Sequence, residues 1–359
     1  MPRRLHPFPV VAVVAAILAA CTGSATPSPS PGSSAASVPP ASASVSGSSS
    51  ASTAPVSLTV GLGYIPNVQF APFYLADQKG YYAAEGVKVT FQNEIDANLV
   101  PKVGGGQVDL GLADGTSVIP AVSQGIPLKY VATIYGKFPS IVFSKASAGI
   151  ASAADLKGRK IGIPGKYGSS WVMLQALLGS ASLKPSDVTI VEYPDFGQGA
   201  AVAAGAVDAA TGFVNNEPVQ LELAGTKTSV LAVDQITPLP GPGIVASTAT
   251  LASKHDAIAG FIRATLKAMN EIATDPSVGV AATAKAVPET AKDPATQTAV
   301  LAATIAAWAP PGAAAGAPLT GAIDRKAWDQ SVAYLTTLGM VPKPVTSADL
   351  VDTSFTAGP

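Results

Sequence analysis

The stretch GQVDLGL at residues 106–112 decides the fold class, because its pattern returns at residues 205–213 as GAVDAATGF. In both copies a Gly-x-Val-Asp sequence leads into a run of small and apolar residues, the composition of a short buried strand. Around each copy, strand-like runs such as VKVTF (87–91) alternate with helix-like runs such as residues 71–79. Strand, helix and strand at this spacing predict right-handed crossovers in a parallel sheet. We therefore predict an α/β protein with two lobes of similar design.

The lobe boundaries are set where this alternation restarts, after the apolar residues 141–143. Strands are expected at 57–62, 87–91, 108–113, 128–134, 160–163, 188–192 and 206–213. A mainly helical region follows, with helices expected at 257–273, 277–287, 297–307 and 327–338. We assign residues 56–142 with 246–359 to lobe 1 and residues 143–245 to lobe 2, so that the final helices return to pack on lobe 1.

The first 55 residues are expected to lie outside the folded part. Arg3 and Arg4 precede an apolar run at 10–20, which is the order of a secretory signal peptide and is shorter than the roughly 20 residues that span a bilayer. The run ends in LAAC, which resembles the bacterial lipobox and implies that Cys21 is lipidated. Residues 21–55 are rich in Ser, Ala and Pro, a composition that predicts a disordered tether. We expect a signal peptide at 1–20 and a lipid anchor on the extracytoplasmic face of a bacterial membrane, in the periplasm or at the cell surface.

The composition excludes several classes of protein. Charged residues make up 13% of the chain and the formal net charge is −1, so a nucleic-acid-binding surface is not expected. Cys21 is the one cysteine, and His6 and His255 are the two histidines. This leaves little material for a disulfide, a metal site or a Ser-His-Asp triad. We therefore expect a protein that is not an enzyme and that carries neither metal nor cofactor.

Several stretches resemble one family, the substrate-binding proteins of ABC importers for nitrate, alkylsulfonates and thiamine-type pyrimidines. They are GYIPN (63–67), APFYLA (71–76), GYY (80–82), EGVKV (85–89), ADLKGRKIGIPG (154–165), LGMVP (338–342) and ADLVD (348–352), together with Trp328. The resemblance implies a two-lobed, hinged fold of the type II periplasmic-binding-protein kind. It also implies a monomer that closes on a small ligand and delivers it to the permease and ATPase subunits of an importer.

Candidate ligand contacts lie in the loops that follow the predicted strands, because ligands of open α/β sheets bind beyond the carboxyl ends of the strands. In lobe 1 these candidates are Tyr64, Asn67, Gln69, Asp114, Tyr135 and Phe138. Their amides can hydrogen bond in both directions, and their rings offer flat apolar faces. Asn67 equally suits a helix cap, and Thr116 or Ser117 is expected to cap the helix after Asp114. Tyr135 and Phe138 equally suit packing at the hinge.

In lobe 2 the loop PGKYGSSW (164–171) joins a strand to a helix, so its glycines and backbone amides can hold an oxyanion. It supplies the candidates Gly165, Tyr167, Gly168, Ser169 and Trp171, and it lacks the Gly-Lys-Ser/Thr ending of a Walker loop. A second loop, GFVNNEP (212–218), supplies Asn216 and Glu217. They resemble an Asn-Glu pair of family members that bind thiamine pyrimidines.

In that second loop, an acidic side chain shielded from water can pair with the amino group and ring nitrogen of a heterocycle. The alternative is that Glu217 only favours the start of a helix. Tyr193, Asp195 and Phe196, at the end of another strand, are weaker candidates.

The stretch YIPNVQF (64–70) departs from the thiamine-pyrimidine branch of the family, which usually carries a histidine at its end. The pyrimidine synthases of the same fold use their own histidine and a cysteine cluster, and the predicted site offers neither. YIPNVQF and NNEPVQ (215–220) instead resemble members associated with riboflavin uptake. We predict a binding protein for a planar vitamin-type heterocycle, either riboflavin or a thiamine pyrimidine precursor. The alternatives are an anion-binding protein that uses Lys137 and Lys166, a pyrimidine-synthesis enzyme, or a sensor or adhesion module.

Overall fold

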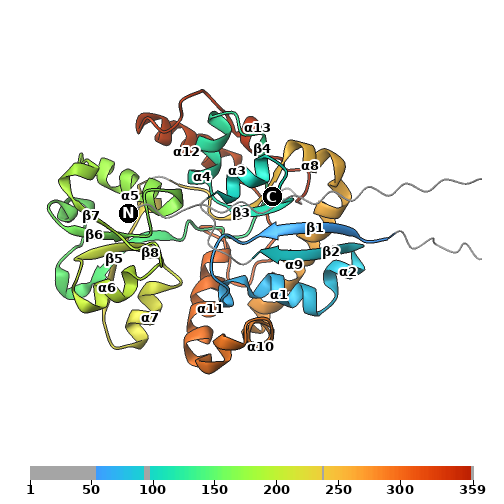
Figure 1. The fold of residues 1–359 in the computed structure, drawn as a ribbon, viewed down its shortest axis with the longest axis horizontal. Coiled ribbons are helices and arrows are strands. Elements are labelled where there is room, and N and C mark those ends of the chain that lie inside the picture. Colours follow the sequence, from blue (N-terminus) through green and yellow to red (C-terminus); the bar gives the residue numbers. More distant parts are fainter. Residues whose placement is uncertain (1–53, 93–97, 237, 357–359) are drawn as a thin grey trace, which may run out of the picture. The chain divides into compact units, whose positions relative to one another are not determined.

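Two five-stranded sheets form the framework of the protein (Figure 1). The computed structural model describes residues 54–92, 98–236 and 238–356, so the predicted signal peptide, Cys21 and nearly all of the predicted tether lie outside the described residues. The first sheet, in the order β2-β1-β3-β10-β4, contains β1 (Val56–Gly61), β2 (Val87–Gln92), β3 (Leu110–Ala113), β4 (Leu128–Thr133) and β10 (Gly243–Ser247). The second, in the order β7-β6-β8-β5-β9, contains β5 (Ser140–Lys145), β6 (Lys160–Ile163), β7 (Thr189–Glu192), β8 (Ala209–Phe213) and β9 (Thr228–Ala232). We keep the names lobe 1 and lobe 2 for the parts built on the first and the second sheet.

Each sheet has the same mixture of parallel and antiparallel pairs. β1 runs parallel to β2 and β3, as β6 does to β7 and β8. β10 runs antiparallel to β3 and β4, and β5 runs antiparallel to β8 and β9. The α/β prediction is confirmed, and the predicted parallel crossovers are present in both sheets. The antiparallel pairs of β5 and β10 were not predicted. The chain passes from lobe 1 to lobe 2 between β4 and β5, and it returns between β9 and β10. β5 and β10 are therefore the first strands after each crossing, and each runs antiparallel to both of its neighbours.

Helices and short turns pack over these sheets, and apolar side chains are buried on both faces of each. The helices are α1 (Ala71–Gln78), α2 (Tyr81–Ala84), α3 (Leu99–Gly104), α4 (Gly115–Ser123), α5 (Gly168–Ser180), α6 (Gln198–Ala204), α7 (Glu217–Leu223), α8 (Thr248–Ser253), α9 (His255–Thr274), α10 (Pro276–Ala286), α11 (Pro294–Trp308), α12 (Arg325–Thr337) and α13 (Ser347–Leu350). The long helix α9 packs its apolar side on α1 and α2, where Phe261 stacks on Tyr82 with ring centroids 5.0 Å apart. The helix predicted at 257–273 is therefore confirmed.

The C-terminal helices contact both lobes. α10 packs against α1, and α11 contacts α10 and, in lobe 2, α7. α12 lies against α4, and its Tyr334 donates a hydrogen bond of 2.9 Å from Oη to the Ala176 carbonyl of α5. Tyr334 and Leu338 also pack against the apolar cores of both lobes. The final helices therefore hold the lobes together as well as covering lobe 1.

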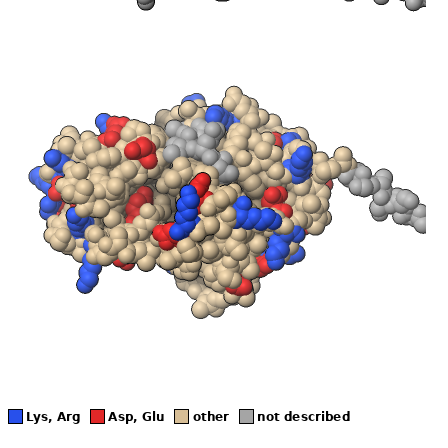
Figure 2. Space-filling view, turned by 60° about the horizontal axis from the view of Figure 1, so that its bottom comes forward, with Lys and Arg blue, Asp and Glu red and all other residues tan. Residues whose placement is uncertain are grey.

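One face of the molecule shows how its charged side chains are distributed. On the face drawn in Figure 2, blue and red side chains are interspersed among larger uncharged areas. Within the described ranges, no helix is both long enough and apolar enough to cross a bilayer. No group of three or more His, Cys, Asp or Glu side chains in those ranges is placed to hold a metal ion.

Candidate functional site

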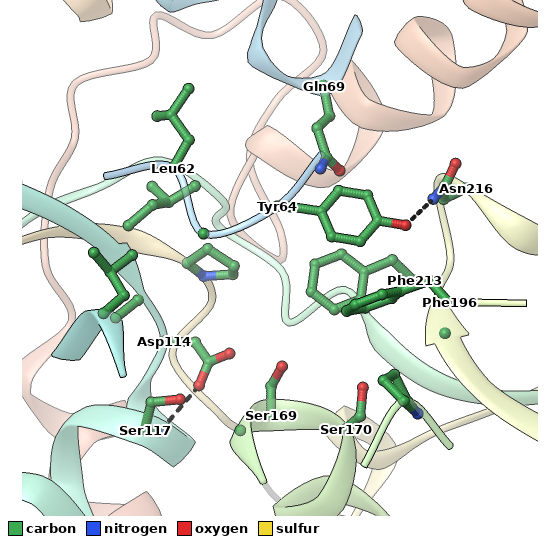
Figure 3. A pocket seen from close by; sticks show the side chains of 18 of the residues that line it. Leu62, Tyr64, Gln69, Asp114, Ser117, Ser169, Ser170, Phe196, Phe213 and Asn216 are labelled. Carbon is green, nitrogen blue, oxygen red and sulfur yellow. Dashed lines mark hydrogen bonds between the residues drawn. The ribbon is translucent and has the colours of Figure 1, made fainter. Parts of the chain in front are cut away.

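A cavity of about 210 Å³ lies between the strand ends of the two lobes (Figure 3). Its lining comes from the segments that follow β1, β3 and β4 in lobe 1 and β6, β7 and β8 in lobe 2. This is the position at which open α/β sheets bind ligands. Nine of the residues predicted from the sequence line it: Tyr64, Gln69, Asp114, Tyr135, Tyr167, Gly168, Ser169, Asn216 and Glu217.

Four other predicted residues do not line this cavity. Asn67 caps the turn before α1, because its Oδ1 accepts a hydrogen bond of 2.8 Å from the Gln69 amide. Phe138 is buried in the core of lobe 2, and Trp171 packs against the same core. Gly165 lies beneath the Tyr167 ring, where an added Cβ would be 2.3 Å from Cε1. Gly165 therefore makes room for a wall of the cavity without being part of it.

An aromatic contact between the lobes forms one side of the cavity. The Tyr64 ring meets the Phe196 ring edge to face, with centroids 4.9 Å apart and an interplanar angle of 79°. Asn216 Nδ2 donates a long hydrogen bond of 3.4 Å to Tyr64 Oη, as Figure 3 shows. Burial raises the pKa of Tyr64, so its ring stays neutral at physiological pH. The backbone of Phe196 has φ +60, a left-handed conformation that bulky residues rarely adopt. Such outliers gather at ligand-binding sites.

Glu217 is the acidic group of the cavity. It is the first residue of α7, and its carboxylate turns back so that Oε2 accepts a hydrogen bond of 2.9 Å from the Phe213 amide. An added Cβ at Gly212 would lie 2.6 Å from Oε2, so this position needs a glycine. Burial raises the pKa of Glu217 to about 7, although the hydrogen bond from Phe213 opposes the shift. At neutral pH the protein therefore holds Glu217 in both the carboxyl and the carboxylate form. Its position at the start of α7 also suits an acidic residue, so the helix role and the cavity role are compatible.

Gln198 is a cavity residue that the sequence reasoning did not identify. Its side chain is 1% exposed, and Nε2 lies 3.2 Å from the Thr211 carbonyl and 3.4 Å from Glu217 Oε1. Gln198 Oε1 is buried and has no hydrogen-bond partner among the described residues. A buried acceptor without a donor is costly, so this oxygen favours a ligand that brings an N–H or O–H group. The one feature of the sequence that could have indicated this role is that Gln198 is the single polar side chain of α6, whose other residues are Gly, Ala and Val.

Asp114 has a structural role at the cavity wall. Its Oδ1 accepts hydrogen bonds from the amides of Thr116 and Ser117, at 3.0 and 3.1 Å, and so caps α4. The expectation that Thr116 or Ser117 caps this helix is therefore wrong. Burial raises the pKa of Asp114, while hydrogen bonds from Thr116, Ser117 and, across the lobes, Ser169 act against that shift. Figure 3 shows the Asp114 carboxyl and the Ser169 hydroxyl facing the same space.

The cavity offers little to a fully charged anion. Among the described residues that line it there is no lysine or arginine. Lys137 Nζ donates to the Ala306 carbonyl at 3.0 Å, and Lys166 Nζ lies 3.9 Å from a Glu192 oxygen. Both lysines are thus directed elsewhere. The polar side chains that line the cavity are hydroxyls, amides and the two carboxyls of Asp114 and Glu217.

Comparisons with known proteins agree with this architecture. The chain is 38% identical over 222 residues to the riboflavin-binding protein RibY of Chloroflexus aurantiacus. This alignment covers 61% of the chain and 63% of RibY. It is 26% identical over 214 residues to a 4-amino-5-hydroxymethyl-2-methylpyrimidine phosphate synthase of Legionella pneumophila, which covers 58% of the chain and 66% of the relative. The matched parts are therefore less than two thirds of the length of these relatives.

Solved structures show the same fold. The alkanesulfonate-binding protein SsuA of Xanthomonas axonopodis, bound to MOPS, aligns with a TM-score of 0.65 at 22% identity, over 84% of this chain and 100% of that protein. The prediction of a two-lobed periplasmic-binding-protein fold is thereby confirmed. A family profile described as NMT1/THI5 like matches residues 67–278, more than half of the sequence. The chain is a member of the NMT1/THI5-like family.

Proposed function

We propose that this protein is the solute-binding component of an ABC importer and that it captures a planar, vitamin-type heterocycle between its lobes. The observation that carries the proposal is the cavity between the lobes, where an aromatic pair lies beside the acceptors of Glu217 and Gln198. The ligand class is riboflavin or a thiamine pyrimidine precursor. The likeness to a protein named for riboflavin binding supports the first of these.

The chemistry of the site suits the edge and the faces of such a ring. Tyr64 and Phe196 present aromatic surface, which favours stacked or edge-to-face contact with a planar ligand. Glu217 Oε1 and the unpartnered Gln198 Oε1 accept hydrogen bonds from N–H groups on the ring edge. A carboxylate at Glu217 accepts an N–H from the amino group of an aminopyrimidine, and a second from its ring nitrogen when that nitrogen carries a proton. A protonated Glu217 pairs with the imide of an isoalloxazine, which offers one N–H beside a carbonyl.

Two observations weigh against the anion-binding and the enzyme alternatives. The sulfonate or nitrate alternative needs Lys137 and Lys166, and both are engaged outside the cavity. The enzyme alternative needs a nucleophile with an adjacent base, and the described lining residues include no histidine, cysteine or lysine. We therefore propose a binding protein that is not an enzyme, although relatives named as pyrimidine phosphate synthases share the family.

The proposed setting is extracytoplasmic. We keep the prediction that residues 1–20 are a signal peptide, that Cys21 carries the lipid, and that residues 21–55 tether the lobes to the membrane. Closure of two hinged lobes on a ligand is a common device of two-lobed binding proteins. Delivery of the closed, loaded monomer to a permease and its ATPase subunits completes the proposed cycle.

A thermal-shift screen tests the proposal. The probes are riboflavin, thiamine, 4-amino-5-hydroxymethyl-2-methylpyrimidine, taurine and nitrate. A probe at a hundred times its dissociation constant stabilises the folded state by about 2.7 kcal/mol. We expect stabilisation by riboflavin or the pyrimidine, and a weaker effect in the variant Glu217→Gln than in Glu222→Gln, which changes an exposed acid on the same helix. Stabilisation by taurine or nitrate alone would refute the proposal.

A further inference from the structure

Behind the Tyr64–Phe196 pair lies a second cavity, of about 460 Å³. It is bordered by the turn after β1, by residues 195–200 and α7 of lobe 2, and by α11. Tyr64, Phe196, Asn216 and Glu217 line both cavities, so these four residues are the wall between them. The first cavity, at about 210 Å³, falls short of the roughly 300–1,000 Å³ typical of small-molecule sites, whereas the second is within that range.

We propose that this second cavity is a subsite for an uncharged, hydroxyl-bearing chain attached to the ring that occupies the first cavity. The inference rests on the proposed function, because it assumes that a heterocycle binds beside Glu217. Within this wall, Tyr64 is held to lobe 2 only weakly, whereas Asn216 and Glu217 accept hydrogen bonds of 2.6 Å and 2.9 Å from Gln220 and Phe213. The hydrogen bond from Asn216 to Tyr64 is 3.4 Å long, and the Tyr64–Phe196 contact is an edge-to-face ring contact with no hydrogen bond between them. The subsite requires the Tyr64 ring to rotate so that a flexible chain can pass, and these weak contacts are the ones that such a rotation would break.

The lining of the second cavity matches hydroxyl groups. It contains the amides of Asn67, Asn216, Gln220 and Gln297 and the hydroxyl of Thr296. Amides and hydroxyls both donate and accept, as the successive O–H groups of a polyol chain require. Gln297 Oε1 is buried and has no partner among the described residues, so it favours a ligand that donates a hydrogen bond.

The same lining disfavours a phosphate at the end of the chain. Its described residues include no lysine or arginine, and its one acidic group besides Glu217 is Asp195. Asp195 Oδ1 accepts a hydrogen bond of 3.1 Å from the Gly197 amide, which fixes the carboxylate in the wall. A phosphate placed here would meet a like charge and no cation. The structure thus assigns the subsite to a neutral alcohol chain and selects against the phosphorylated form of the same compound.

The test compares three flavins that share one ring: riboflavin with its ribityl chain, lumiflavin with a methyl group in place of the chain, and riboflavin 5′-phosphate. Dissociation constants are measured by flavin fluorescence for the wild-type chain, for Gln297→Leu, and for Thr298→Val. The last is a control at the next position of α11, an exposed residue that does not line the cavity.

We expect the wild type to bind riboflavin more tightly than both other flavins. Gln297→Leu should weaken riboflavin binding about two- to tenfold, the usual range for one lost hydrogen bond, and leave lumiflavin binding unchanged. Thr298→Val should change neither. Equal affinity for riboflavin and lumiflavin, or equal weakening of both by Gln297→Leu, would overturn the subsite and leave the proposed function intact. If no flavin binds, the subsite and riboflavin as the cargo are both refuted.

Discussion

Replacing Glu217 with Gln should remove a pH dependence from the stability of the ligand-free protein. Burial raises the pKa of this carboxyl from 4.5 to about 7 in the folded state. The folded protein therefore holds a proton that the unfolded chain has already released between these two pH values. The resulting contribution to stability is fully present below about pH 4.5 and is lost as the pH rises through about 7.

The size of the effect follows from the shift. One pKa unit corresponds to about 1.36 kcal/mol, so the difference between 4.5 and about 7 amounts to about 3 kcal/mol once the pH exceeds 7. Glu217 borders the cavity and is only partly buried as a residue, so water screens the charge and this figure is an upper value. Wild type and Glu217→Gln should be about equally stable near pH 4.5. The variant should become more stable than the wild type as the pH rises.

Equilibrium urea denaturation at several pH values between about 4.5 and 8.5 measures this difference. Other titrating groups act equally on both proteins, so the difference between them isolates Glu217. Glu222→Gln is the matched control, since Glu222 is an exposed acid on α7 that accepts a hydrogen bond of 2.7 Å from Thr228 Oγ1. Its stability should follow the wild-type pH profile. A gap between wild type and Glu217→Gln that stays constant with pH would show that the carboxyl is not desolvated as described.

Substitutions at three further positions test the packing around the site. Asp114→Ala should destabilise the protein by about 0.5–2 kcal/mol, because α4 loses its N-terminal cap. Asp114→Asn should keep most of the wild-type stability, because Asn also caps helices, and a denaturation curve distinguishes the two variants. Gly136→Ala should destabilise the protein by about 1–3 kcal/mol and lower the Tm, because the new Cβ would lie 2.4 Å from the Pro310 nitrogen. An unchanged Tm would contradict this close approach of the Gly136 and Pro310 backbones. Thr304→Val should cost about 1–3 kcal/mol in urea denaturation, because Asn215 Nδ2 would lose its 2.8 Å acceptor in a buried contact between the lobes; wild-type stability would mean that this contact is not formed in solution.

Most of the cavity could be predicted because it depends on local features. Each loop that follows a strand carries its polar and aromatic residues within a few positions of the strand end, and the strand ends of a sheet share one edge. This rule predicts four of the cavity residues, namely Tyr64, Asp114, Ser169 and Glu217. Gln198 was not, because its position depends on α6 packing beside β8, which brings its amide to the Thr211 carbonyl. No local pattern in the sequence encodes that pairing.

The sheet order could not be predicted for a related reason. The alternation of strands and helices fixes the type of each element but says nothing about its neighbours. β10 is a five-residue strand, buried along its whole length, that follows a Pro-Gly-rich segment, so its hydrophobic pattern has no alternation to reveal a direction. Its antiparallel place between β3 and β4 arises from the return of the chain from lobe 2. The contacts of α12 with α5 depend in the same way on where the lobes meet.

The two lobes contribute different chemistry to the cavity, and in the proposed function this difference would couple closure to recognition. Lobe 1 supplies mainly apolar surface, including Leu62, Phe70 and Leu112, and Oδ1 of its acid Asp114 is engaged in capping α4. Lobe 2 lines the cavity with Gln198, whose buried Oε1 has no partner among the described residues, and with Glu217. A ring that only packs on lobe 1 gains apolar contact but leaves the acceptors of lobe 2 unsatisfied, which costs free energy in a closed, water-poor cavity. A ring with N–H groups on its edge satisfies both lobes at once. If the protein binds a heterocycle as proposed, its closed state would therefore select for the hydrogen-bonding edge of the ligand, whereas apolar packing alone would accept many planar molecules.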